Sequence, residues 1–114
     1  MKTKDQAYYQ KLVIGGQWKK VAKVLSGGSQ QERDWVFEAL GHAAARSDEH
    51  YNQLMGFFQE AADKPTKLSA IRALGSCARS SALSQLELLG NRTDDPEIQD
   101  ALTEARHTLR ASIK

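Results

Sequence analysis

The chain has 114 residues, a formal net charge of +2, 40% hydrophobic residues and 26% charged residues. These values are typical of one folded domain and exclude an intrinsically disordered chain. No segment approaches the roughly 20 apolar residues of a membrane span, and the first residues lack the apolar run of a secretory signal, so we expect a cytoplasmic protein that does not enter a membrane.

Charge alternates in sign along the chain. Residues 1–28 carry six lysines and one acid, and residues 29–63 carry two arginines and seven acids. Residues 64–92 carry five basic residues and one acid, and residues 93–114 carry three basic residues and five acids. We expect neighbouring blocks to attract each other through exposed side chains. A basic N-terminal patch for an acidic partner is the alternative interpretation.

Two short helices are predicted in residues 1–28. Thr3 is placed to cap the first, with Gln6 completing a capping box, and this helix ends at Gly15-Gly16. The second runs from about Gln17 to Ser26 and stops at a second glycine pair. Its apolar stripe consists of Trp18, Val21, Ala22 and Leu25, and its other face carries Lys19, Lys20 and Lys23.

The next two helices cover residues 29–63. Ser29 and Glu32 form a capping box that opens a long helix to about Arg46, and Ser47 caps a helix that extends to about Asp63. The buried face expected for the first consists of Trp35, Val36, Ala39, Leu40, Ala43 and Ala44. The stripe expected for the second consists of Tyr51, Leu54, Met55, Phe58, Ala61 and Ala62, with Phe57 at its edge.

Three further helices are predicted after residue 63. Pro65 suits the first turn of a helix that extends to about Arg79, and a short helix follows from Ala82 to about Gly90. Asp94-Asp95-Pro96 then opens the last helix. The buried residues expected in the first of these three are Leu68, Ile71, Leu74, Cys77 and Ala78. Those expected in the last are Ile98, Ala101, Leu102, Ala105 and Leu109.

Two stretches of the sequence repeat each other. Phe37-Glu38-Ala39-Leu40-Gly41-His42-Ala43-Ala44 and Ile71-Arg72-Ala73-Leu74-Gly75-Ser76-Cys77-Ala78 lie thirty-four residues apart. A period of this length is typical of stacked helix pairs, each of which is stable only against its neighbours. Gly41 and Gly75 occupy the same place in the two copies. Since a glycine inside a helix costs about 1 kcal/mol relative to alanine, we expect another helix backbone to come close at each.

The later copies resemble HEAT repeats in their short bacterial form. The resemblance is carried by Pro65, Ala70-Ile71-Arg72-Ala73-Leu74-Gly75, the run 82–89, and Asp94-Asp95-Pro96 with the residues up to Leu102. The seven predicted helices, with no strand candidate and mostly short connections, indicate an all-α fold. The resemblance implies that antiparallel helix pairs stack as a short right-handed α-superhelix, or α-solenoid. It also implies that helices 17–26, 48–63 and 82–90 line the concave surface.

The resemblance covers residues 29–112 of a single domain, 1–114. Residues 29–63 and 64–92 are the best repeats, and residues 93–112 form a C-terminal capping helix. Residues 1–28 are a divergent first pair that looks more like a tetratricopeptide unit, with Tyr9, Leu12, Gly16 and Trp18 at suggestive spacings. The later copies lack the tetratricopeptide aromatic pattern, which favours the HEAT-like interpretation.

The sequence predicts no enzyme, no cofactor and no metal site. The three histidines have no zinc-binding spacing, the single Cys77 is expected to be a buried apolar residue, and no nucleophile or phosphate-loop motif occurs. His42 is expected to face solvent.

The favoured function is that of a non-enzymatic helical-repeat module, which binds a protein partner of unknown identity through its concave face. The residues expected to contact the partner are Lys20, Lys23, Gln53, Phe57, Glu60 and Gln85. The alternative is a nucleic-acid-binding module that uses the basic N-terminal helices, with Lys11 near the lysines of the second helix and Trp18 as a stacking surface. Apolar area at Tyr8, Tyr9, Val13 and Ile14 is also expected to favour a weak homodimer.

Overall fold

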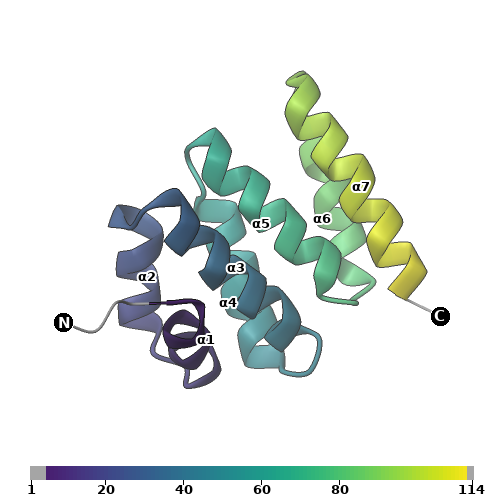
Figure 1. Ribbon diagram of the computed structural model, residues 1–114. Coiled ribbons are helices and arrows are strands. Elements are labelled where there is room, and N and C mark those ends of the chain that lie inside the picture. Colours follow the sequence, from purple (N-terminus) through teal and green to yellow (C-terminus); the bar gives the residue numbers. More distant parts are fainter. Residues whose placement is uncertain (1–4, 113–114) are drawn as a thin grey trace.

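A computed structural model of the protein describes residues 5–112, and these form seven α-helices and no strand (Figure 1). The helices are α1 (Gln6–Ile14), α2 (Trp18–Gly27), α3 (Gln30–Ala44), α4 (Asp48–Glu60), α5 (Lys64–Ser76), α6 (Ser81–Gly90) and α7 (Pro96–Ser112). The prediction of an all-α fold with seven helices is confirmed. None of these helices combines the length and the apolar character needed to cross a bilayer.

The helices lie in two rows. In the odd row, α1, α3, α5 and α7 pack directly on one another in chain order, and the most extensive contacts are those of α5 with α3 and α7 (Figure 1). In the even row, each of α2, α4 and α6 contacts the odd helix before it and the odd helix after it. The even helices make little or no direct contact with one another. The molecule measures 44 × 30 × 19 Å.

The odd row contains most of the core because its central helices have neighbours on several sides. α5 buries eight of its thirteen residues, whereas α4 buries only Leu54 completely. In α7 the predicted stripe is confirmed for Ile98, Leu102, Ala105 and Leu109, and Ala101 is half-buried. The even helices therefore keep much more of their surface accessible than the central odd helices.

The two repeated glycines lie where odd helices cross. A β-carbon on Gly41 of α3 would stand 2.7 Å from the carbonyl oxygen of Ala73 on α5. A β-carbon on Gly75 of α5 would stand 3.0 Å from the Cα atom of Ala105 on α7. The expected close approach of a second helix is confirmed at both positions, and it explains why α3 and α5 tolerate an internal glycine.

The helix caps agree with the sequence at most ends. Ser29 and Glu32 form the predicted capping box, and the Ser47 hydroxyl accepts from the backbone N–H of His50. Asp63 caps α5, and Asp95 accepts from the backbone N–H groups of the first turn of α7. The first helix differs, because Asp5 caps it. The predicted cap, Thr3, lies outside the described residues.

Several predicted details of the middle helices were wrong. α4 ends at Glu60 rather than Asp63, and Ala62 is exposed in the connection that follows. α5 ends at Ser76, three residues before the expected Arg79. Ala78 consequently lies beyond the helix, exposed, with a left-handed φ of +54°.

The N-terminal apolar surface is smaller than the sequence suggested. Tyr9 and Val13 are fully buried. The Tyr9 ring stacks on Trp35 at 5.8 Å between ring centres, and its hydroxyl donates a hydrogen bond to Glu32. Ile14 remains exposed, and Tyr8 is half-buried. The expected homodimer surface was therefore wrong in half of its residues, because Tyr9 and Val13 belong to the core.

Ion pairs connect blocks of opposite charge, as the sequence predicted. Lys64 bridges Asp95 at 3.0 Å and Glu97 at 2.9 Å, and so joins residues 64–92 to residues 93–114. Arg79 bridges Asp48 at 2.7 Å and so joins residues 64–92 to residues 29–63. These side chains are partly or largely exposed, so each ion pair contributes little to the stability of the fold.

Candidate functional site

Two hollows open between the helices of the even row. The first, which we call the α2–α4 hollow, has a volume of about 310 Å³, and the second, the α4–α6 hollow, has a volume of about 330 Å³. Ala61, just after α4, lines both. They exist because the even helices scarcely touch one another, so that residues of the odd row form the floor between them. Both volumes lie at the lower end of the range of ligand pockets, about 300–1,000 Å³.

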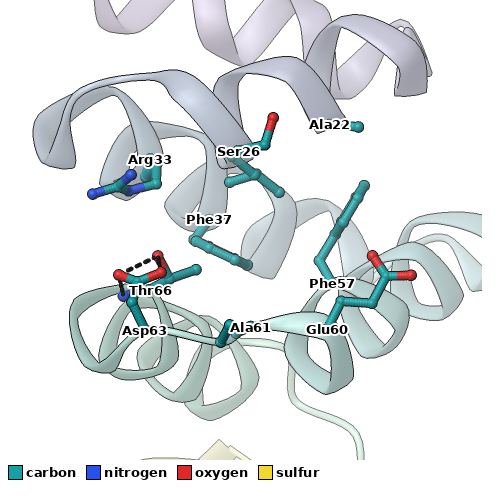
Figure 2. A pocket seen from close by; sticks show the side chains of 11 residues that line it. Ala22, Ser26, Arg33, Phe37, Phe57, Glu60, Ala61, Asp63 and Thr66 are labelled. Atoms are coloured by element: carbon teal, nitrogen blue, oxygen red, sulfur yellow. Dashed lines mark hydrogen bonds between the residues drawn. The ribbon is translucent and has the colours of Figure 1, made fainter.

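The α2–α4 hollow combines aromatic surface with charges of both signs. Figure 2 shows Phe37 in the middle, Arg33 and Asp63 on one side, and Phe57 and Glu60 on the other. The remaining lining residues are Ala22, Leu25, Ser26, Ala61, Ala62 and Thr66.

Arg33 is held in place by its terminal nitrogens. Its Nη1 donates to the carbonyl oxygen of Gly28 at 3.2 Å, and its Nη2 donates to the Gln30 side chain at 3.1 Å. Its Nε is buried without a hydrogen-bond partner. The guanidinium therefore keeps its positive charge at the wall of the hollow while its position is fixed by α3 and the turn before it.

Asp63 caps α5, and the hydrogen bonds that it accepts there hold the pKa of its carboxyl below the ordinary value. It accepts hydrogen bonds from the Thr66 hydroxyl at 2.8 and 2.9 Å and from the Thr66 backbone N–H at 3.3 Å (Figure 2). The hydroxyl bond is the main cause that lowers the pKa of Asp63, against the opposing effect of burial. The hollow thus has a fixed cation and a fixed anion on the same side.

The α4–α6 hollow has a different chemical character. Its lining consists of Phe58, Gln59, Ala61, Lys67, Gln85, Leu88, Leu89 and Arg92. Lys67 and Arg92 are both cationic, and no acid among residues 5–112 contributes to the lining. Leu88 is 47% exposed and is one of two large apolar residues so exposed in residues 5–112, the other being Ile14.

A third hollow, of about 240 Å³, lies between α1 and α2. It is lined by Tyr8, Tyr9, Leu12, Lys20, Lys23 and Val24. We call it the α1–α2 hollow. No acidic residue within the described range forms an ion pair with Lys20 or Lys23.

The six residues predicted to contact a partner are divided among these hollows. Phe57 and Glu60 line the α2–α4 hollow, Gln85 lines the α4–α6 hollow, and Lys20 and Lys23 line the α1–α2 hollow. Gln53 is half-buried on α4 and lines none of the three. All six belong to even helices, but the structure does not gather them into one site.

Sequence reasoning missed the charged residues of the odd row that reach these hollows, namely Arg33 and Lys67. It also missed Arg92, in the turn after α6, and the exposure of Leu88. The available signal for Leu88 was its place beside, rather than within, the stripe of Leu83, Leu86 and Leu89. Arg33, Lys67 and Arg92 have no such signal in the sequence. Each resembles an ordinary charged surface residue, and its place beside a hollow follows only from the packing of the helices.

Other candidate residues lie away from the hollows. Cys77 is fully buried, as expected, and burial raises the pKa of its thiol. His42 is exposed, also as expected. Among residues 5–112, no group of three or more His, Cys, Asp and Glu side chains is placed to hold a metal ion. Comparison with known proteins finds no matching family, no matching curated protein and no matching solved structure.

Proposed function

We propose that this chain is a non-enzymatic helical-repeat module of the HEAT type, which binds a protein partner along its even row. The observation that carries this proposal is the pair of hollows on either side of α4, which share Ala61 and repeat along the row. Each offers apolar surface next to charge, the combination that lets a partner's side chain insert and be oriented.

The arrangement of the seven helices in two rows supports the proposal. The odd helices pack directly on their neighbours in chain order, and every even helix returns against the odd row. Such a quasi-linear order of contacts is what a short α-solenoid of HEAT-like pairs requires. In that arrangement the even row is a continuous side of the stack, long enough for an extended or helical partner segment to contact both hollows.

The test is photo-crosslinking in the source cell from single positions that carry a photoreactive phenylalanine analogue. Glu60 and Gln85 report on the even row, and Glu38 and Glu104 on the exposed side of the odd row. We expect the same protein to be crosslinked from both even-row positions and from neither odd-row position. Crosslinking of that protein mainly from Glu38 and Glu104 would contradict the proposal.

The α1–α2 hollow favours a second candidate function, the binding of nucleic acid. Lys20 and Lys23 lie beside the half-buried Tyr8 and form no ion pair with a described acid. A cation next to an aromatic ring suits a phosphate next to a stacked base. Two lysines in one hollow are, however, far fewer than the continuous basic stripe of typical nucleic-acid-binding proteins, so this function ranks second.

A further inference from the structure

We propose that the α4–α6 hollow selects an acidic segment of a partner protein, in which a carboxylate lies next to a bulky apolar side chain. This inference rests on the proposed function and names the chemistry of the partner. The first observation is that the charged residues around the hollow are basic. Lys67 of α5 and Arg92 of the turn after α6 both line it, and no acid from the described part of the chain does.

These two cations are not neutralised within the described residues. The ion pairs of the neighbouring basic side chains are made by Lys64, with Asp95 and Glu97, and by Arg79, with Asp48. Neither Lys67 nor Arg92 forms an ion pair with any acid in residues 5–112. Two cations beside one hollow repel each other, and an anion bound between them relieves that repulsion and gains two charge-assisted contacts.

The apolar part of the hollow requires that the anion carry a large apolar group. Phe58, Leu88 and Leu89 form this part, and 47% of Leu88 is exposed. A side chain inserted here would cover Leu88, the one large exposed apolar residue at a hollow of the even row. Small inorganic anions would leave that surface in water, so the hollow favours an amphiphilic ligand over a simple ion.

A peptide fits this chemistry better than a nucleic acid does. Nucleic acids bind through many phosphates and need an extended basic track. Here the two cations share their hollow with the apolar side chains of Phe58, Leu88 and Leu89. The adjoining α2–α4 hollow is lined by two carboxylates, Glu60 and Asp63, which would repel a continuing phosphate backbone. The same carboxylates are compatible with a peptide that is acidic only where it meets Lys67 and Arg92.

The experiment is selection of a displayed random peptide library on the intact protein, followed by affinity measurements on the selected peptides by fluorescence anisotropy. We expect the selected peptides to share an Asp or Glu next to Leu, Phe or Trp. We expect the Lys67→Glu/Arg92→Glu variant to bind them at least about tenfold more weakly, and added salt to weaken binding to the parent. Leu88→Ala should weaken binding by a similar factor.

Matched controls separate this hollow from general effects of charge and hydrophobicity. Lys19→Glu/Arg46→Glu makes the same change in net charge at two exposed sites away from the hollow, and Ile14→Ala truncates the other exposed apolar residue. Both control variants should bind like the parent. Lys67→Gln/Arg92→Gln keeps the approximate size of both side chains and removes their charge without introducing carboxylates. A loss of peptide binding in this variant therefore reports the loss of the two positive charges alone. Circular dichroism checks that every variant is folded.

Four outcomes would overturn the inference. Selected peptides without acidic residues, or peptides whose affinity is unchanged in Lys67→Glu/Arg92→Glu, would show that the two cations do not select the ligand. Tight binding of a fluorescent single-stranded oligonucleotide that is lost in the same variant would assign the hollow to nucleic acid. Peptides that depend on Phe57 and Glu60 instead would overturn this inference while leaving the even-row function intact, whereas photo-crosslinks from the odd row would overturn that function itself.

Discussion

Gly41 of α3 and Ala73 of α5 lie so close that a β-carbon on Gly41 would stand 2.7 Å from the carbonyl oxygen of Ala73 and 3.0 Å from its Cα atom. Both atoms belong to backbone, so a helix must move to admit a methyl group. We therefore expect Gly41→Ala to lower the free energy of unfolding by about 1–3 kcal/mol, despite the better helix propensity of alanine. Urea unfolding followed by circular dichroism measures this change.

Gly56 of α4 is the matched control. It is also inside a helix, but a β-carbon there would meet no atom within 4 Å. Gly56→Ala should raise the free energy of unfolding by about 0.5–1 kcal/mol, because only the propensity gain remains. If both variants gained stability equally, the direct packing of α3 on α5 would be contradicted.

Ala78 is a site where glycine should stabilise the protein. It is exposed and adopts φ +54°, a conformation in which a β-carbon is strained. Ala78→Gly should raise the free energy of unfolding by about 0.5–1 kcal/mol. In Ala45→Gly, at the end of α3, φ is −64° and alanine is unstrained, so the same substitution should cost about 0.4–1 kcal/mol. The melting temperatures of the two variants should therefore shift in opposite directions. A shift in the same direction would contradict the left-handed backbone conformation of Ala78.

Arg79 joins the connection between α5 and α6 to two helices, α3 and α4. Its contribution to stability depends more on the geometry of these contacts than on its charge. Its Nε donates to the carbonyl oxygen of Ala44 at 2.7 Å, and its guanidinium lies 4.8 Å from the ring centre of Tyr51. A lysine retains the charge but cannot make both contacts. We expect Arg79→Lys to cost about 1–2 kcal/mol in urea unfolding.

Asp48 tests the ionic part of the same arrangement. It forms an ion pair with Arg79, but its side chain is 88% exposed. Asp48→Asn should therefore cost less than about 1 kcal/mol, and less than Arg79→Lys. If Asp48→Asn lost more stability than Arg79→Lys, the ion pair would matter more at this site than the contacts of Arg79 with the Ala44 carbonyl and the Tyr51 ring.

Tyr9 predicts a stability loss at alkaline pH. Burial, followed by the hydrogen bond and the negative charge of Glu32, raises the pKa of Tyr9 from 10.0 to about 12. The folded state therefore favours the neutral phenol, and the stability that this provides is complete below pH 10 and is lost as the pH rises through about 12. We expect the melting temperature of the parent to fall between these values more steeply than that of Tyr9→Phe, which has no proton to lose. Parallel curves for the two proteins would contradict the raised pKa.

The nucleic-acid alternative makes a prediction that we expect to fail. If it held, the parent would bind labelled oligonucleotides at physiological salt, with an affinity that falls steeply as salt rises, and Lys19→Gln/Lys20→Gln/Lys23→Gln would abolish that binding. We expect no binding by the parent in anisotropy titrations. Binding that the triple variant removes would place this function above the protein-binding one.

Much of the fold could be predicted because its signals are local. The repeated glycines predicted two helix crossings correctly, and Ser29, Ser47 and Pro65 marked helix starts to within one or two residues. Helix ends were less accurate: Ala78 continued an apolar pattern although the chain had already left the helix at Ser76. An apolar residue continues a pattern whether or not the backbone stays helical, so such ends depend on how the following loop packs.

The candidate site could be predicted only in part because its hollows are tertiary. Phe57 was identified from its place at the edge of a helical stripe, and that residue does line a hollow. Phe37, Arg33 and Lys67 line hollows from the odd row, and nothing in their own segments distinguishes them from core or surface residues. Which side chains face a space between helices depends on the distance between those helices, and the close crossings of the odd row set that distance.

The contrast between the two rows has a mechanical consequence. The odd row is joined by backbone-to-backbone contacts at Gly41 and Gly75, whereas the even helices scarcely touch. We therefore expect the molecule to be stiffer along the odd row than along the even row, and to bend at the two glycine crossings. Such bending would widen or narrow the hollows on both sides of α4 together. A partner segment bound between α4 and α6 would therefore change the distance between α2 and α4. Binding in one hollow would then alter the affinity of the other hollow through strain in the fold.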